Sequence, residues 1–209
     1  MDPKLADHQG LTIDADGLVI NKDGLHPLNY RWTLWYDGPS NAPKTLKSYE
    51  ENLKVITTFG TAEHMWGVFN YLMEPSRLQL GSNYHLFKEG ISPKWEDAAN
   101  ENGGTWAIMV PKNESSSLDA KWMKSVFMLI GDQMDPENID DVAGLSLTIR
   151  KQKENRLGLW TKTAANKDLQ MAIGKNWKDI IEWPGEIEYK FHKESMSKSY
   201  GKGGPAYFV

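Results

Sequence analysis

The 209-residue chain contains no cysteine, which excludes disulfides and thiolate metal sites and fits a reducing compartment. It has no apolar run near the ~20 residues that a membrane-spanning helix needs, and its first residues lack the basic-then-apolar layout of a secretion signal. Positive charge is not in excess either, because the formal net charge is −4. We therefore expect a cytoplasmic or nuclear protein without membrane contact, in which any nucleic-acid contact is confined to one pocket or groove.

Motifs of catalysis and cofactor binding are also missing. The sequence has no nucleophile–base signature, no glycine loop of the kind that cradles phosphate, and no histidine pair at metal-ligand spacing. The adjacent acids Glu96–Asp97 and Asp140–Asp141 do not form a dyad, because neighbouring residues of an extended chain point in opposite directions. We expect no enzymatic activity, no metal and no cofactor.

Acidic residues gather at the N-terminus. Residues 1–24 contain five aspartates and two lysines, and they show no hydrophobic periodicity. We expect residues 1–24 to be a flexible acidic tail. Residues 25–209 are expected to form one domain, because this length supports one sizeable core.

Hydrophobic patterning predicts an α+β fold, with an antiparallel sheet and helices on one of its faces. Alternating apolar residues predict strands at 31–37, 83–88, 105–110, 145–150, 156–161 and 186–191. Helical spacing instead marks 61–74, 117–130 and 166–181. Thr61 and Ser117 are placed to cap the first two helices, and Gly131 is placed to end the second.

Aromatic residues are more frequent than a core of this size requires, with nine Trp, eight Tyr and six Phe. We expect some of these rings on the surface, and Tyr49 and Trp95 are the candidates. Trp95 precedes Glu96 in a turn-rich stretch. The pair suits a ligand that needs both a flat apolar surface and a carboxylate; alternatively, Trp95 only pins a loop to the core.

Basic residues form a second candidate feature. Arg150, Lys151, Lys153 and Arg156 flank two predicted strands, and Lys198 and Lys202 lie in a glycine-containing segment near the C-terminus. Each could be a solvated surface charge. Together they suit a short phosphate chain better than a long duplex, which needs a larger positive field.

The helix predicted at 117–130 carries two apolar faces. One stripe contains Leu118, Trp122 and Val126, and a different face carries Met123 and Phe127. A helix that is apolar nearly all round is either fully buried or meets a second partner, and the pattern alone leaves both possibilities open for Met123 and Phe127.

Five segments, in their order and spacing, resemble landmarks of the 4E family of eukaryotic translation initiation factors, which bind the messenger RNA cap. They are HPLNYRWTLWY (26–36), LFKEGISPKWEDAANENGGTW (86–106), LIGDQM (129–134), GLSLTIR (144–150) and LGLW (157–160). The resemblance runs from about residue 25 to the C-terminus. It implies a curved antiparallel sheet shaped like a cupped hand, with three helices on its convex face.

The resemblance also implies roles for individual residues. The cationic 7-methylguanine base would lie between the rings of Tyr49 and Trp95, while Glu96 would accept two N–H groups from the base edge. Trp160 matches a ring near the N7 methyl group. The triphosphate would be held by three basic residues, Arg150, Arg156 and Lys198.

The sequence also departs from the family pattern. Most translation-promoting members have Trp at the position of Tyr49, and a basic residue is common at the position of Gln152. Repressive members usually lack the Trp that is retained here as Trp32. Gly201 occupies the place of a phosphorylatable serine found in some relatives. These departures indicate a divergent member outside class I, and they leave open whether it promotes or represses translation.

A second site is implied on the convex side, where the family accepts a Tyr-x-x-x-x-Leu-hydrophobic helix from scaffold or repressor proteins. The matching residues are His26, Pro27, Ala62, Trp66, Met123, Phe127, Gly131 and Asp132. We therefore expect a monomer that binds capped messenger RNA and one such partner. Two alternatives are an aromatic-platform carbohydrate-binding module, which does not need the basic residues, and a cap-hydrolysing enzyme.

Overall fold

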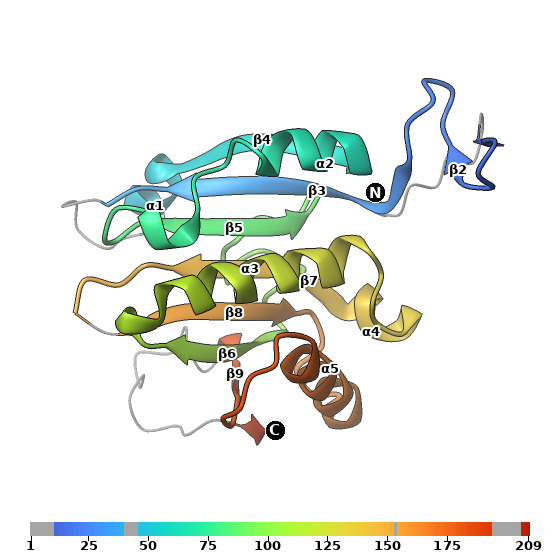
Figure 1. Cartoon of the computed structure of the whole chain (residues 1–209). Coiled ribbons are helices and arrows are strands. Elements are labelled where there is room, and N and C mark those ends of the chain that lie inside the picture. Colours follow the sequence, from blue (N-terminus) through green and yellow to red (C-terminus); the bar gives the residue numbers. More distant parts are fainter. Residues whose placement is uncertain (1–10, 40–45, 153, 194–205) are drawn as a thin grey trace.

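The structure is a computed structural model that describes residues 11–39, 46–152, 154–193 and 206–209 (Figure 1). Its centre is a curved, open antiparallel sheet with the strand order β10-β9-β6-β8-β7-β5-β3-β4. The strands are β3 (Pro27–Asp37), β4 (Leu53–Thr61), β5 (Asn83–Lys88), β6 (Gly104–Val110), β7 (Val142–Thr148), β8 (Asn155–Thr161), β9 (Glu188–Phe191) and β10 (Tyr207–Phe208). The predicted α+β class with an antiparallel sheet is confirmed.

Three helices cover the convex face of the sheet, in front of the strands in Figure 1. They are α2 (Ala62–Phe69), α3 (Ser115–Ile130) and α5 (Lys167–Ile180). The short helix α4 (Pro136–Asp141) follows α3, and α1 (Leu46–Asn52) lies between β3 and β4 in the chain. No helix in the described segments is both long and apolar enough to cross a membrane.

Alternation along β5 separates the two faces of the sheet. The Tyr84 ring stacks on Trp122 of α3, with ring centroids 6.1 Å apart. The next residue, His85, points to the opposite face and meets the edge of Tyr49 from α1, at 6.4 Å between centroids. Helix α1 therefore lies against the concave face, while α2, α3 and α5 pack on the convex one.

The core lies between the sheet and the convex helices. Four tryptophans, Trp32, Trp106, Trp122 and Trp177, are almost completely buried there. The predicted stripe of α3 is confirmed, because Leu118, Trp122, Val126, Leu129 and Ile130 are all buried. Large rings that fill such a layer leave little freedom for the sheet to change its curvature.

Several predicted boundaries need correction. The helix predicted at 61–74 ends at Phe69, because the chain must turn back towards β5 and Pro75 opens a 3-10 turn (Pro75–Arg77) instead. Strand β7 begins three residues before its predicted start and ends at Thr148. Helix α3 begins at Ser115 rather than after Ser117, and its N-cap Glu114 makes no side-chain cap bond.

Two predicted helix ends are confirmed. The Thr61 hydroxyl accepts a hydrogen bond from the His64 amide at 3.3 Å, as an N-cap residue does. Helix α3 ends at Ile130 with Gly131 as its C-cap.

The segment before β3 contains local structure. Strands β1 (Thr12–Ile13) and β2 (Val19–Ile20) pair antiparallel, and the Asp14 carboxylate accepts the amides of Asp16 and Leu18 in the connecting turn. Residues 1–10 lie outside the described residues. The division into a tail at 1–24 and a domain at 25–209 therefore stays a prediction.

We predict that Gly174→Ala destabilises the fold. A Cβ at Gly174 in α5 would lie 2.5 Å from Cε2 of the buried Trp106, so either the helix or the ring must shift. Overpacking of this kind costs about 1–3 kcal/mol in the free energy of unfolding, measurable by urea denaturation. Gly67→Ala in α2 is the matched control, because its Cβ would meet nothing within 4 Å; it should be neutral or stabilise by up to ~1 kcal/mol. Equal stability of the two variants would contradict the close packing.

Candidate functional site

The loop between β5 and β6 is held by its own side chains. The Asp97 carboxylate accepts hydrogen bonds from the amides of Ser92 at 2.9 Å and Ala99 at 3.0 Å. The Asn100 side-chain amide donates to the carbonyl oxygens of Ser92 at 2.8 Å and Lys94 at 2.9 Å. One acid of the Glu96–Asp97 pair therefore holds the loop.

Trp95 and Glu96 project from this loop into solvent. The Trp95 side chain remains 37% exposed, and Glu96 is exposed as well. Within the described part of the chain, the Glu96 carboxylate makes no hydrogen bond or ion pair. Ile91 of the same loop is buried in a small cluster with Phe87 and anchors the loop to the sheet. An aromatic surface and an unpaired carboxylate are thus presented side by side.

A small buried cluster on the concave face supports the loop from below. It contains Phe87, Ile91, Ala143 and Trp160. Trp160 meets the Phe87 ring edge-on at 5.4 Å, and its indole N–H donates to the Ser146 hydroxyl at 2.8 Å. Trp160 is therefore fixed on the concave face with only 6% of its surface exposed. The contact of Trp160 with the N7 methyl group stays a prediction.

His192 links the loop to the sheet, a role that no local sequence pattern indicated. Its ring lies 4.5 Å from Trp160 between centroids. Nδ1 pairs with the Asn100 carbonyl oxygen and Nε2 with the Thr105 hydroxyl, both at 2.7 Å. Because a carbonyl only accepts, Nδ1 carries the proton and Nε2 accepts from the hydroxyl. Burial lowers the pKa of His192 to about 4, so the ring is neutral at pH 7.

Tyr49 reaches the same loop from α1. Its hydroxyl donates to the Pro93 carbonyl oxygen at 2.7 Å, two residues before Trp95. Burial raises the pKa of Tyr49, and the negative charges of Asp37 and Glu96 raise it further. Glu96 is thus close enough to Tyr49 to act on it electrostatically. The structure brings Tyr49, Trp95 and Glu96 into one region, and the two rings do not contact each other.

A buried pair of polar side chains, His85 and Asp37, lies behind Tyr49 on the concave face. Nε2 of His85 is 3.0 Å from the Asp37 carboxylate, and both side chains are less than a tenth exposed. The Asn83 amide also donates to Asp37. The sequence offered only alternation in these strands, so neither the pair nor its contact with Tyr49 was predicted.

The two predicted arginines that the structure describes lie at one end of the sheet. Arg150 follows β7, and its amide donates to the Asn155 side chain at 3.2 Å. Arg156 on β8 pairs with Met109 of β6 and Thr148 of β7. The Arg156 side chain passes over Gly158 on the concave face. Glycine leaves space for it, because a Cβ at Gly158 would lie 3.2 Å from Nη1 of Arg156.

Arg156 also acts on the loop support, because its charge contributes to the lowered pKa of His192. A third predicted phosphate contact, Lys198, lies outside the described residues, as do Lys153, Gly201 and Lys202.

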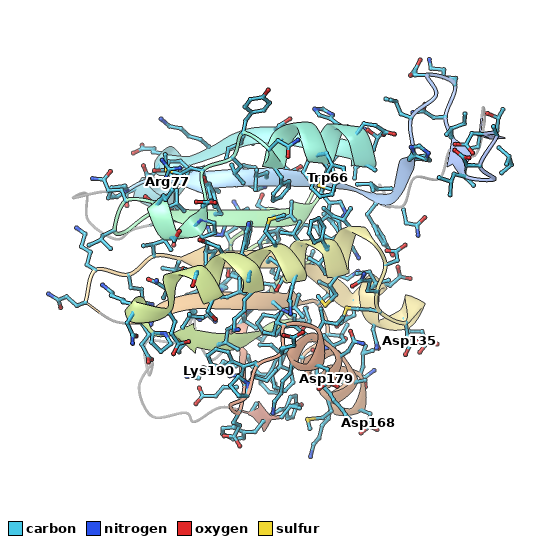
Figure 2. The ribbon with its side chains drawn as sticks, in the orientation of Figure 1. Trp66, Arg77, Asp135, Asp168, Asp179 and Lys190 are labelled. Atoms are coloured by element: carbon cyan, nitrogen blue, oxygen red, sulfur yellow. The ribbon has the colours of Figure 1, made fainter. Side chains whose placement is uncertain are left out.

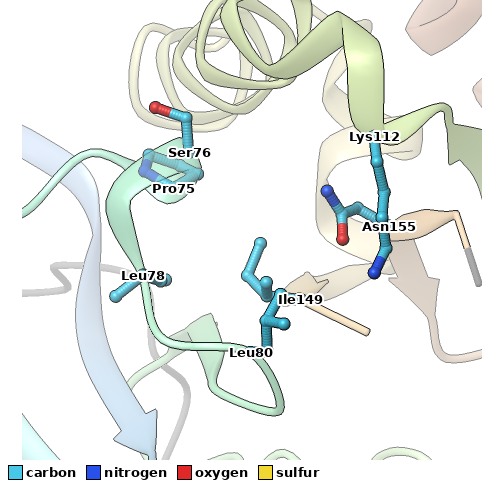
Figure 3. A pocket seen from close by; sticks show the side chains of 7 residues that line it. All are labelled: Pro75, Ser76, Leu78, Leu80, Lys112, Ile149 and Asn155. Carbon is cyan, nitrogen blue, oxygen red and sulfur yellow. The ribbon is translucent and has the colours of Figure 1, made fainter. Parts of the chain in front are cut away.

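A pocket of about 210 Å³ opens elsewhere, near the start of α3 (Figure 3). Its polar groups are already used, because Ser76 bonds to Asp119 and the Lys112 ammonium donates to the Lys151 carbonyl oxygen. We assign it no ligand. In the segments that the structure describes, no cluster of three or more His, Asp or Glu could hold a metal ion. The pocket is lined by Pro75, Ser76, Leu78, Leu80, Lys112, Ile149 and Asn155.

The predicted partner surface lies on the convex side, where α2 and α3 run beside each other. Trp66 of α2, labelled in Figure 2, is 49% exposed and packs against Phe127 of α3, with ring centroids 5.4 Å apart. Met123 and Phe127 are half-buried rather than fully buried. The surplus apolar face of α3 therefore continues across to α2 and stays open to solvent.

Polar contacts hold the two ends of this surface. Both the backbone amide and the ring of His26 bond to Glu63, which raises the pKa of His26, and the Ala62 amide donates to the His26 carbonyl oxygen at 2.9 Å. These bonds fasten the start of β3, at Pro27, to α2. After α3, Asp132 adopts a left-handed backbone (φ 46°) and accepts a hydrogen bond from Asn29.

The open sheet, the three helices on its convex face and the exposed aromatic–acid loop beside its concave face define a class of α+β proteins. The family model described as Eukaryotic initiation factor 4E matches residues 27–204. This chain belongs to the eukaryotic initiation factor 4E family.

Known proteins resemble the chain over most of its length. The Eukaryotic translation initiation factor isoform 4E of Arachis hypogaea is 40% identical over 174 residues, which cover 83% of each chain. The complex of C. elegans eIF4E-3 with the 4E-binding protein Mextli and cap analog superposes with a TM-score of 0.79 at 33% identity, covering 88% of this chain and 99% of that one. Ascaris suum eIF4E-3 with the m2,2,7G cap gives a TM-score of 0.80 at 32% identity, covering 88% and 98%.

We predict that His192 makes stability depend on pH. Its pKa in the folded protein, about 4, lies below the ordinary value of 6.5, so the unfolded chain binds this proton first as the pH falls. The stability that the neutral ring contributes is fully present above pH 6.5 and is lost towards pH 4, by on the order of 1–3 kcal/mol.

His192→Gln tests this expectation, because its amide can still donate to Asn100 but does not titrate. Urea unfolding at pH 7 and pH 4.5 should show a smaller loss for the variant than for the wild type. Equal losses would contradict the role of His192.

Proposed function

We propose that this protein binds the 7-methylguanosine cap of messenger RNA at the concave face and couples it, through the α2–α3 surface, to a scaffold or repressor protein in translation initiation. The observation that carries this proposal is the exposed Trp95 beside Glu96, which makes no hydrogen bond or ion pair with the described residues, on a loop that Asp97 and Asn100 hold in place. Such a loop is built to present those two groups.

The chemistry of the cap base matches these groups. Methylation at N7 gives guanine a positive charge, so aromatic rings on its two faces add cation–π attraction to stacking. Trp95 supplies one ring and Tyr49 the other. Glu96 accepts the two N–H groups on the edge of the guanine, a charge-assisted bidentate pair that adenine does not offer. The negative potential of Glu96 and Asp37 at Tyr49 favours a cationic base over a neutral one.

The phosphate chain of the cap meets the basic end of the concave face. Arg156 lies on that face, Arg150 follows the neighbouring strand, and Lys198 is proposed to join them from the C-terminal segment. These residues favour a cap over a carbohydrate, which needs aromatic platforms but no cations. Trp160 is proposed to border the methyl group.

The solved relatives support both halves of the proposal. The C. elegans relative was solved with a cap analog together with a 4E-binding protein, and the Ascaris suum relative with an m2,2,7G cap. On this chain the partner would lay an amphipathic Tyr-x-x-x-x-Leu-hydrophobic helix across Trp66, Met123 and Phe127. We propose that the domain at 25–209 carries both sites and acts in the cytoplasm as a monomer, binding without catalysis.

We predict that Trp95→Ala or Glu96→Ala removes retention on a 7-methyl-GTP resin. Hydrogen bonds to a charged group are each worth about 1.5–3 kcal/mol, so loss of Glu96 should weaken binding at least ~10-fold. Glu101→Ala is the matched control, because Glu101 is an exposed acid of the same loop. Wild-type retention by both site variants, with circular dichroism unchanged, would refute the site.

We predict that Trp66→Ala disrupts partner binding but leaves cap affinity unchanged. Buried interface tryptophans commonly cost at least ~2 kcal/mol when truncated, so a synthetic Tyr-x-x-x-x-Leu-hydrophobic helix should bind more than ~10-fold more weakly. Trp95→Ala provides the reciprocal control and should bind this peptide normally. A fall in cap affinity with Trp66→Ala would show that the two surfaces are not separate.

A further inference from the structure

Two cross-links join α1 to the loop that carries Trp95. The Tyr49 hydroxyl donates to the Pro93 carbonyl oxygen at 2.7 Å. The Lys94 ammonium forms an ion pair with Glu50 at 2.7 Å. The linked residues are adjacent in both segments, so Tyr49 and Glu50 face Pro93 and Lys94 directly. The hydroxyl bond is part-buried, whereas the ion pair is exposed and contributes less.

Tyr49 is held from its other side as well. Its ring meets His85 edge-on, and His85 is fixed by the buried Asp37. The end of α1 is also attached to the sheet, because the Asn52 amide donates to the Gly38 carbonyl oxygen at 2.7 Å. The Tyr49 ring therefore has a fixed position relative to the sheet, and its hydroxyl transmits that position to the loop.

A base that stacks on two rings requires a fixed separation between them. If the two ring-bearing segments move independently in the free protein, binding must first order them, and that cost reduces affinity. A hydrogen bond already present in the free protein removes part of the cost. Tryptophan at this position offers a larger ring but no hydroxyl, so tyrosine exchanges stacking area for this cross-link.

We propose that the Tyr49 hydroxyl is a positioning group for cap recognition: by donating to Pro93 it sets the separation between α1 and Trp95 before the nucleotide binds. This inference rests on the proposed cap-binding function. It assigns to the hydroxyl a role distinct from stacking, which the ring alone supplies.

Tyr49→Phe tests the inference because it keeps the ring and removes only the hydroxyl. One uncharged hydrogen bond is worth about 0.5–1.5 kcal/mol, so affinity for 7-methyl-GTP, measured by calorimetry, should fall about two- to tenfold. Hydrogen exchange of the free variant should also speed up at loop amides such as Ser92, Asn100 and Gly103, and by more than at amides in the centre of the sheet. Saturating 7-methyl-GTP should restore their protection, because the bound base then holds the loop.

Tyr71→Phe is the matched control, because Tyr71 is 92% exposed and should affect neither measurement. Unchanged loop exchange in free Tyr49→Phe, or cap affinity equal to or tighter than wild type, would overturn the positioning role. A positioning role that fails while Glu96→Ala still abolishes binding leaves the proposed function intact. A wild type that does not bind 7-methyl-GTP removes the proposed function, while the exchange of the free protein still reports on the cross-link.

Discussion

The arrangement of the concave site depends on one constraint: the loop between β5 and β6 is held by side chains other than the two it presents. Asp97 and Asn100 satisfy its backbone, and His192 ties its Asn100 carbonyl oxygen to Thr105 of the sheet. Trp95 and Glu96 take no part in these bonds, so both side chains remain accessible to a ligand.

The same constraint explains the buried polar groups behind the site. Burial lowers the pKa of His192 and keeps its ring neutral, so the ring can accept from Thr105 and donate to Asn100. The Asp37–His85 pair supports Tyr49, because Asp37 holds the His85 ring and His85 contacts the Tyr49 ring edge-on. On the concave face, buried polar groups such as His85 and His192 therefore lie beneath the aromatic side chains. The convex face is instead packed with large apolar side chains. This asymmetry is what the proposed function needs, with a nucleotide on one face of the sheet and a peptide helix on the other.

The apolar stripe of α3 follows directly from its helical period, because one face of the helix must be buried against the sheet. Strand β5 was also predicted, although side chains on both of its faces are buried. The edge strand β4 was missed, since its solvent-exposed Val55 and Ile56 blur the alternation. Helix α1 was missed because seven residues form a stable helix only through tertiary contacts.

The predicted helix at 61–74 extends five residues beyond the observed end at Phe69. Leu72 and Met73 continue the apolar period after the chain has turned, so periodicity alone could not mark the end.

Only part of the candidate site could be predicted from the sequence. The resemblance to a family supplied Tyr49, Trp95 and Glu96, but periodicity and spacing could not have joined residues more than 40 positions apart. The contacts that organise them, from Tyr49 to Pro93 and from His192 to Asn100, are long-range and leave no local pattern. Lys198 lies outside the described residues, so its contribution to phosphate binding rests on the resemblance alone.

The most direct test of this account is a calorimetric titration of the wild-type protein with GTP and with 7-methyl-GTP under identical salt and pH. The two nucleotides have the same phosphates and the same base edge, and they differ in the methyl group and the positive charge that it creates. The account predicts a strong preference for the methylated nucleotide, because the two rings and the nearby carboxylates all favour a cation. Equal affinities would contradict it.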